Sequence, residues 1–273
     1  MTRRVVISRV VYAAIGVMFL ASLNEFGLLD VTVWVNGIDN LRVFAGDLLP
    51  PDWAVMDTLL DAMLETIQIA FVGTLLGLAF SIPLAVFGTR TLFGPMVTVP
   101  ARLVVGAIRT VPSLLWGVIF VVGFGLGPAA GALGVALYSV GYLGKLYYES
   151  FEAVDPEVLE AVRGAGANRP QLIVFAVLPE SANALVSHLL FMFEYNIRAS
   201  SIMGFVGAGG IGFYMLGYLQ LLQYDRLMTA LFLTFIVVMA VDYLSARLRS
   251  YMVPSMMSSR GRAPLLAGLT AVP

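Results

Sequence analysis

The sequence has no cysteine, one histidine and one lysine among 273 residues, and only 12% of its residues are charged. Without cysteine there is no disulfide framework and no cysteine-ligated metal site. His188 lies in an apolar run, which favours a hydrogen-bonded packing role, since no second histidine could complete a metal site. Lys145 could serve a P-loop, but Ser139 and Leu146 stand where that motif needs glycine and Ser or Thr. We therefore expect no nucleotide site, metal site or catalytic residue in this chain.

Apolar residues, by contrast, dominate the composition. The chain is 59% hydrophobic with a mean hydropathy of +0.90, whereas an ordinary globular domain is about 45–50% apolar and about 25% charged. The sequence therefore predicts an all-α membrane protein in contact with the lipid bilayer. The formal net charge of −1 gives no reason to expect a nucleic-acid partner.

The N-terminus predicts a first membrane helix over residues 1–29. Arg3, Arg4 and Arg9 precede an uncharged run, residues 10–24. A cleaved secretory signal peptide is the alternative. The retained helix is favoured because the apolar run reaches the upper end of the usual length of about 7–15 residues and no Ala-x-Ala site follows it.

The next segment, residues 30–61, is rich in aspartate. It holds six aspartates against one arginine, and Pro50-Pro51 divide it into two parts. We expect it to be an extracytoplasmic loop.

Three uncharged runs predict further crossings. Thr66–Thr89 is long enough for one, and Gly73 and Gly77 lie four residues apart, which favours close helix packing. Thr110–Gly144 is divided by the glycines and proline of residues 123–128, which predicts two crossings joined outside. After Pro179 a helix continues to about residue 199, and residues 227–241 form another crossing.

The basic residues decide how the glycine-rich run Ala199–Tyr224 is interpreted. With six crossings, thirteen of the sixteen basic residues lie on the cytoplasmic side, including Arg109, to which we assign no chemistry. A seventh crossing would place the C-terminal arginines outside. Ala199–Tyr224 is therefore expected to be re-entrant or to lie near the outer face, where it lines a translocation path. We expect a core over residues 62–250 and a cytoplasmic tail over residues 251–273, so that both termini are cytoplasmic.

A short polar helix is expected just after residue 154. Asp155 can cap it, Pro156 suits its first position, and Gly164 and Gly166 end it. Its short apolar stripe must pack on something, because so short a helix is not stable alone. A segment resting on the membrane surface is the alternative, but Glu157 and Glu160 would meet anionic lipid unfavourably.

Two motifs resemble one known family. Glu160-Ala161-Val162, followed by Gly166 and by Leu178-Pro179, resembles the cytoplasmic loop of membrane subunits of bacterial ABC importers, with Val162 and Ala176 departing from the usual Ala and Ile. Residues 193–200 and 204–212 resemble the permease subunit of phosphonate importers in the binding-protein-dependent transport family. The likeness covers about residues 50–249.

The resemblance implies a type I ABC importer bundle of about six transmembrane helices in the bacterial inner membrane, which forms a homodimer. It also implies two ABC ATPase subunits, which bind ATP and Mg, and an extracytoplasmic substrate-binding protein. The expected cargo is phosphonate, with phosphate and phosphite as alternatives. Within the loop 149–179 the apolar residues are expected to fill a groove of the ATPase, the charged residues to contact its rim and the glycine to allow a turn: Val158, Leu159, Glu160, Ala161, Val162, Arg163 and Gly166.

A second group of residues is expected at the translocation path or gate. Glu194 and Arg198 lie four apart on one helix, so they can form a structural pair; alternatively, Arg198 offers donors to an anionic substrate. Residues 207–212 satisfy G-x-G-x-x-G, but no βαβ unit surrounds them, so close packing or a flexible gate is favoured over a dinucleotide site. The expected path or gate residues are Glu194, Asn196, Arg198, Ser200, Ser201, Gly207, Gly209, Gly210 and Gly212.

Two other functional classes are weighed against the importer. An ion-coupled secondary transporter or channel would work without an ATPase, but it should show internal repeats or intramembrane acid relays, for which only Glu194 is a candidate. An intramembrane hydrolase needs a nucleophile and a base on facing helices, and one histidine with no cysteine disfavours it.

Overall fold

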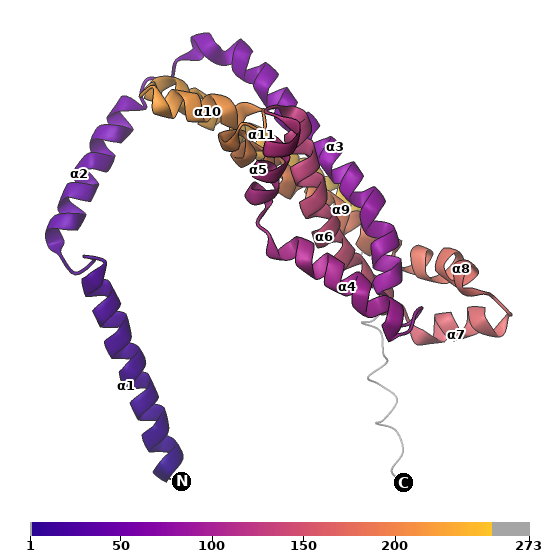
Figure 1. Cartoon of the computed structure of the whole chain (residues 1–273). Helices are drawn as coiled ribbons and strands as arrows, with labels where there is room; N and C mark the ends of the chain where they lie inside the picture. Colours follow the sequence, from indigo (N-terminus) through magenta and orange to yellow (C-terminus); the bar gives the residue numbers. More distant parts are fainter. Residues whose placement is uncertain (1, 253–273) are drawn as a thin grey trace, which may run out of the picture.

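The computed structural model describes residues 2–252, with side chains over residues 8–251, and the chain is helical through almost all of this range (Figure 1). The predicted tail lies almost wholly outside the described residues. The elements are α1 (Thr2–Glu25), α2 (Val31–Asp47), η1 (Trp53–Val55), α3 (Met56–Gly88), α4 (Pro95–Thr110), α5 (Ser113–Phe124), α6 (Pro128–Glu152), α7 (Pro156–Gly164), α8 (Arg169–Leu172), the π-helix η2 (Ile173–Val177), α9 (Leu178–Met203), η3 (Gly204–Val206), α10 (Ile211–Gln220) and α11 (Tyr224–Met252).

The number of crossings agrees with the prediction of about six. Within the described residues, four helical stretches are long and apolar enough to cross a membrane: Trp53–Gly88, Pro128–Glu152, Arg169–Val206 and Tyr224–Tyr251. The bent pair α4–α5 adds a fifth if it is one span. α1, with 24 residues, is about 36 Å long and could be a sixth; that it crosses stays a prediction.

Of the two crossings predicted within Thr110–Gly144, the first needs different bounds, because α4 and α5 can form it only together, as one bent span. α6 can cross, but α5 has 12 residues and is about 18 Å long, too short for a hydrocarbon core of about 30 Å. The chain instead bends by 88° between α4 and α5. Val111 is extended there with ψ 121°, because Pro112 disfavours a helical residue before it.

The aspartate-rich segment, predicted as an extracytoplasmic loop between crossings, is also largely helical. α2 occupies 17 of its residues, and α3 already begins at Met56. An aspartate caps the start of α2: Asp30 accepts hydrogen bonds from the Thr32 hydroxyl and backbone N–H, which lower the pKa of its carboxyl. The extracytoplasmic position of the segment stays a prediction.

α3 and α6 form the centre of the bundle. A Cβ on Gly73 would lie 2.5 Å from Val135 Cγ1, and one on Gly77 would overlap Ser139. The glycines predicted to bring helices close therefore do so, and α6 is the neighbour that they admit.

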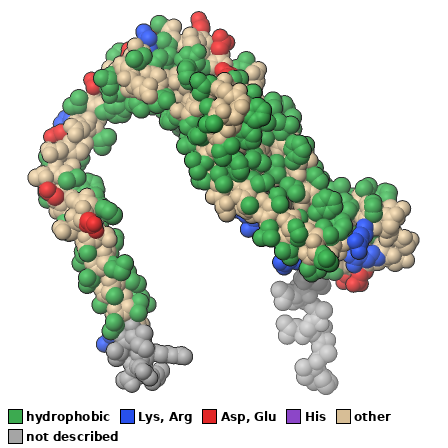
Figure 2. Space-filling model, in the orientation of Figure 1, with side chains coloured by type: hydrophobic (Ala, Val, Ile, Leu, Met, Phe, Trp, Pro, Cys, Tyr) green, Lys and Arg blue, Asp and Glu red, His purple; other side chains and the backbone are tan. Residues whose placement is uncertain are grey.

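α1 and α2 extend away from this bundle as an arm (Figure 1). The C-terminal end of α2 contacts the start of α11. There the rings of Phe44 and Tyr224 lie edge to face with centroids 5.0 Å apart. In the space-filling view, acidic side chains gather near that end of the bundle and basic ones at the opposite end, around α7 and α8 (Figure 2).

α10 follows α9 after a glycine-rich turn. Its 10 residues extend only about 15 Å, so it cannot cross a membrane. Ala199–Tyr224 is therefore not a crossing, as predicted. The C-terminal end of α9 and the N-terminal end of α11 thus lie on the same side of the membrane.

Candidate functional site

α7 is the predicted docking helix, and it forms over the predicted residues. Asp155 accepts a hydrogen bond from the Glu157 N–H at 2.9 Å, Pro156 occupies the first turn, and the helix ends at Gly164. Gly166 follows with a φ of +84°, a left-handed conformation that glycine adopts without strain. The local sequence signals therefore fix both ends of this helix.

The expected role of its apolar residues needs correction. Leu159 is 4% exposed and belongs to a core of this chain together with Phe151 and Leu172, and Val158 and Val162 pack against that core. Leu159 therefore cannot fill a groove of another protein. The face that remains exposed holds Pro156, Glu157, Glu160, Ala161, Arg163, Gly164 and Gly166.

Two arginines connect the α7–α8 region to the loop after α3. Arg163 donates a hydrogen bond to the Thr91 carbonyl oxygen at 2.8 Å. The Arg169 guanidinium lies 5.5 Å from the centre of the Phe93 ring. A displacement of α7 would therefore be felt at the α3–α4 loop as well as at η2, which packs against α7.

The polar residues predicted at the path divide into two groups. Asn196, Ser200 and Ser201 are buried within this chain. The Asn196 amide donates to the Thr74 and Ser139 hydroxyls, each at 2.8 Å, and so joins α9 to α3 and α6. This group lies buried between helices of this chain; that it lines a path stays a prediction.

Glu194 and Arg198 form the predicted pair. Arg198 Nη2 lies 2.8 Å from Glu194 Oε1, and its Nη1 lies 3.4 Å from Asp242 Oδ2 on α11. Arg198 is therefore shared by two carboxylates, and its positive charge is more than neutralised. This geometry favours the structural interpretation over donation to an anion.

The glycine-rich turn between α9 and α10 packs tightly. Gly207, Gly209 and Gly210 have φ values of +74° to +83°, and a Cβ on Gly212 would overlap the Ser201 carbonyl oxygen. A cavity of about 280 Å³ lies beside the turn, and Glu65 of α3 contributes a carboxylate to its lining. Gly207, Gly209 and Gly210 thus build a compact turn, Gly212 lets α10 approach α9, and Glu65 is a neighbour that sequence reasoning missed.

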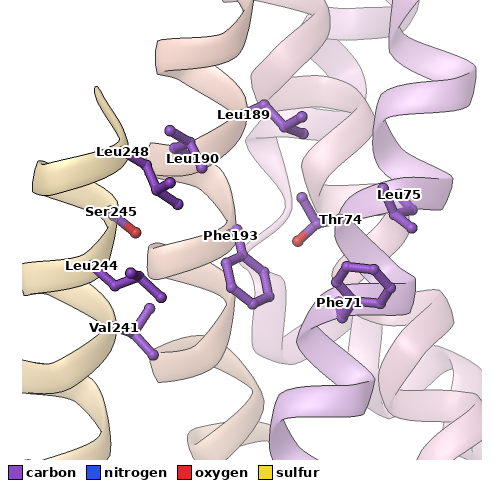
Figure 3. A pocket seen from close by; sticks show the side chains of 10 residues that line it. All are labelled: Phe71, Thr74, Leu75, Leu189, Leu190, Phe193, Val241, Leu244, Ser245 and Leu248. Carbon is purple, nitrogen blue, oxygen red and sulfur yellow. The ribbon is translucent and has the colours of Figure 1, made fainter. Parts of the chain in front are cut away.

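An apolar groove of about 270 Å³ lies between α3, α9 and α11 (Figure 3). Thr74 and Ser245 supply the only hydroxyls in its lining, and the Thr74 hydroxyl is already bonded to Ala70 and Asn196. Phe71, Phe193 and Leu244 contribute hydrocarbon. The groove therefore has the chemistry of a lipid-facing surface and offers nothing to an anion.

A layer of aromatic rings covers a different face, formed by α6 and α9. The centroid of the Tyr138 ring lies 5.6 Å from that of Tyr195, and the Tyr142 centroid lies 6.5 Å from Tyr195, with interplanar angles of 22° and 9°. The Phe191 centroid lies 6.3 Å from that of Tyr142. The Arg109 guanidinium lies 5.5 Å from the Tyr142 centroid.

The position of Arg109 differs from the sequence prediction. It lies against Gly141, near the middle of α6, and not at the cytoplasmic end of the bundle. The three tyrosines were not predicted at the site either. Only their i, i+3 and i+4 spacings on two separate helices could have suggested them, and the sequence does not show that these helices face each other.

Comparison with known proteins decides the family. Residues 73–258 match the binding-protein-dependent transport system inner membrane component family. The chain belongs to this family. The predicted ABC importer permease bundle is thereby confirmed, and the chain is a component of a transport system.

Individual relatives agree with this family assignment. The chain is 38% identical over 237 residues to the phosphite transport system permease protein PtxC of Stutzerimonas stutzeri, covering 86% of both chains. It is 36% identical over 208 residues to the phosphate-import permease protein PhnE of Mycolicibacterium smegmatis, covering 76% of this chain and 39% of that relative.

The fold has solved counterparts as well. One inward-facing structure of the MetNI methionine ABC transporter has a TM-score of 0.64 at 22% identity and covers 74% of this chain and 99% of that one. This likeness shows the permease fold alone.

Proposed function

We propose that this chain forms the transmembrane path of an ATP-driven importer for a phosphorus oxyanion: phosphite, phosphate or phosphonate. The observation that carries the proposal is the similarity to the phosphite permease over 86% of both chains. The phosphate-import permease adds a second relative with the same class of cargo. The anions share a tetrahedral phosphorus and negatively charged oxygens, so one path could accept all of them.

The proposed energy source is a separate ATPase that binds ATP and Mg and docks on the exposed face of α7. Lys145 is the single lysine and lies in no P-loop motif. Glu157, Glu160 and Ala161 are exposed, while the opposite face of the helix is fixed to the core by Leu159. A helix held on one side and free on the other can bind a partner and transmit its displacement.

Two copies of the chain, two ATPases and an extracytoplasmic binding protein complete the proposed assembly. The four or five spans found in the described residues are few for enclosing a path in one copy. The tyrosine layer on α6 and α9 is also half-exposed on two helices that are long and apolar enough to cross a membrane, where polar groups need a facing protein or water. We place the assembly in the inner membrane with both termini cytoplasmic.

Uptake by proteoliposomes containing the complete complex tests this proposal. We expect labelled phosphite, phosphate or phosphonate to accumulate only with ATP on the ATPase side and with the binding protein on the other side. A matched preparation with a catalytically inactive ATPase is the control. Uptake that continues with this inactive ATPase would favour an ion-coupled transporter and contradict the proposal.

A further inference from the structure

We infer that Arg109, with the hydroxyls of Tyr138, Tyr142 and Tyr195, is the intramembrane contact site for the transported phosphorus oxyanion. This inference rests on the proposed function, because it assumes that such an anion passes through this chain. It gives Arg109, to which the sequence assigned no chemistry, the anion-binding role that was one of two alternatives for Arg198, and three observations on the described residues carry it.

The first observation is the depth of Arg109. A Cβ on Gly141 would lie 2.8 Å from Arg109 Cγ, so Arg109 lies beside Gly141. By helical rise, Gly141 is about 20 Å from the Pro128 end of α6 and about 16 Å from the Glu152 end. Arg109 therefore lies beside the midpoint of α6, a helix long and apolar enough to cross a membrane, and an ionisable residue within a crossing marks a functional site by default.

The second observation is the absence of a counter-charge. In the described part of the chain, carboxylates pair with Arg102, Lys145, Arg198 and Arg226, but none lies within 4.0 Å of the Arg109 guanidinium. Arg109 is exposed, and its described neighbour is the face of the Tyr142 ring. An arginine that stacks on a ring keeps its N–H donors available for an oxyanion.

The third observation is the chemistry of the surrounding surface. Tyr138 and Tyr142 flank the midpoint of α6, whereas tyrosines that face lipid gather at the two membrane interfaces. All three tyrosines are half-exposed on one face of the bundle. Their hydroxyls are neutral donors, which can bind successive positions of an anion without holding it as tightly as a charged cluster would.

The bend between α4 and α5 supports the same location. It leaves non-helical backbone at Val111 and Pro112, which begins two residues after Arg109. Such backbone persists at membrane depth only where it is buried in protein or lines a water-filled cavity. Because Thr110 and Arg109 are exposed, we place a water-filled path at this bend.

The alternative cation, Arg198, lacks these properties. Glu194 and Asp242 both contact it, so an anion at Arg198 would meet two carboxylates. Tyr195 and Arg198 line one cavity of about 200 Å³. We expect the anion to pass through this cavity on its way to or from the Arg109 site without binding strongly there.

The test compares variants in the complete reconstituted complex. Arg109→Gln removes the charge, Arg109→Lys keeps it, and Tyr142→Phe removes one hydroxyl while keeping the ring that stacks. Lys145→Gln, one turn beyond Gly141 along α6, is the control because the ion pair that Lys145 forms among the described residues is with Glu149 of the same helix. The readouts are phosphite or phosphate imported per ATP hydrolysed, ATPase activity stimulated by the binding protein, and thermal stability in detergent.

We expect Arg109→Gln to lower the anion imported per ATP by about tenfold or more, the usual size of a lost charge-assisted contact. Arg109→Lys should lower the anion imported per ATP by a smaller factor, and Tyr142→Phe should lower it severalfold. Thermal stability and stimulated ATPase activity should remain as in the control. A merely structural role of Arg109 would lower stability and ATPase activity together.

Wild-type import per ATP in Arg109→Gln would overturn the inference and leave the proposed function intact. If Arg109→Gln fails to assemble, Tyr142→Phe and Tyr195→Phe decide: normal import by both overturns the inference, and reduced import with normal ATPase activity supports it. Failure of the wild-type complex to import any phosphorus oxyanion would instead contradict the proposed function.

Discussion

At the scale of single residues, charges in this chain occur in two distinct settings. Arg198 is held between Glu194 and Asp242, whereas Arg109 lies on an aromatic ring without a carboxylate partner in the described residues. An arginine paired with two carboxylates links helices, whereas an arginine without a carboxylate partner can bind an anion. The number of carboxylate partners therefore distinguishes the two roles.

The Arg198 cluster makes a testable prediction. Arg198→Gln leaves two carboxylates near each other without a cation, so we expect a lower yield of folded protein. A triple variant, Glu194→Gln, Arg198→Gln and Asp242→Asn, removes all charges and should recover both yield and transport. Size-exclusion chromatography measures the yield of folded protein, and uptake by proteoliposomes measures transport. A triple variant that folds but does not transport would show that Arg198 itself acts on the anion.

At the scale of elements, α7 shows how one helix separates two functions. Leu159 faces the core of this chain, and Glu160 and Ala161 face outward. The apolar spacing in the sequence predicted a buried stripe correctly, but it could not tell whether the stripe is covered by this chain or by a partner. That distinction depends on Phe151 and Leu172, which approach Leu159 only in the folded protein.

We predict opposite effects for two substitutions on α7. Leu159→Ala should destabilise the permease itself by about 2–5 kcal/mol, because it leaves a cavity in the core. Ala161→Trp should leave thermal stability unchanged and reduce ATPase binding by at least tenfold, because a large side chain then stands on the proposed contact face. Thermal unfolding and co-purification of the ATPase measure these effects. Unimpaired ATPase binding by Ala161→Trp would contradict docking on this face.

The glycine-rich turn allows a similar comparison within one element. Gly212→Ala should lower stability by about 1–3 kcal/mol, since its Cβ would overlap the Ser201 carbonyl oxygen. Gly217→Ala, on the same helix, meets no atom within 4 Å, so it should be neutral or slightly stabilising. Thermal unfolding of the two variants checks this. Equal stability of both would mean that α9 and α10 do not approach closely at Gly212.

At the scale of the whole molecule, the sequence predicted the class and the family well and the interior less well. Long uncharged runs, the basic residues around them and the small residues Gly73 and Gly77 are local signals, and they led to a helical membrane bundle with α3 packed on α6. The broken span at Pro112 and the position of Arg109 beside Gly141 depend on how distant helices meet. The spacing of residues within one helix does not show which other helix it will contact.

The absence of cysteine makes the orientation of the bundle directly testable. Single cysteines at Leu221, after α10, and at Gly164, at the end of α7, lie at exposed positions. In spheroplasts, a membrane-impermeant maleimide should label Leu221→Cys directly and Gly164→Cys only after permeabilisation. The opposite pattern would invert the proposed orientation and place α7 out of reach of a cytoplasmic ATPase.

The π-helix η2 makes the orientation of α9 depend on the exact number of residues before it. Arg169–Val206 is one continuous span, and within its Arg169–Met203 part the wide turn at Ile173–Val177 interrupts the α-helical geometry. Deleting one residue on either side of this turn would rotate everything beyond it by about 100°. Tyr195 would then turn away from Tyr142, although every side chain except the deleted one would still be present. Insertions and deletions between α8 and Tyr195 should therefore be far more damaging than substitutions at the same positions.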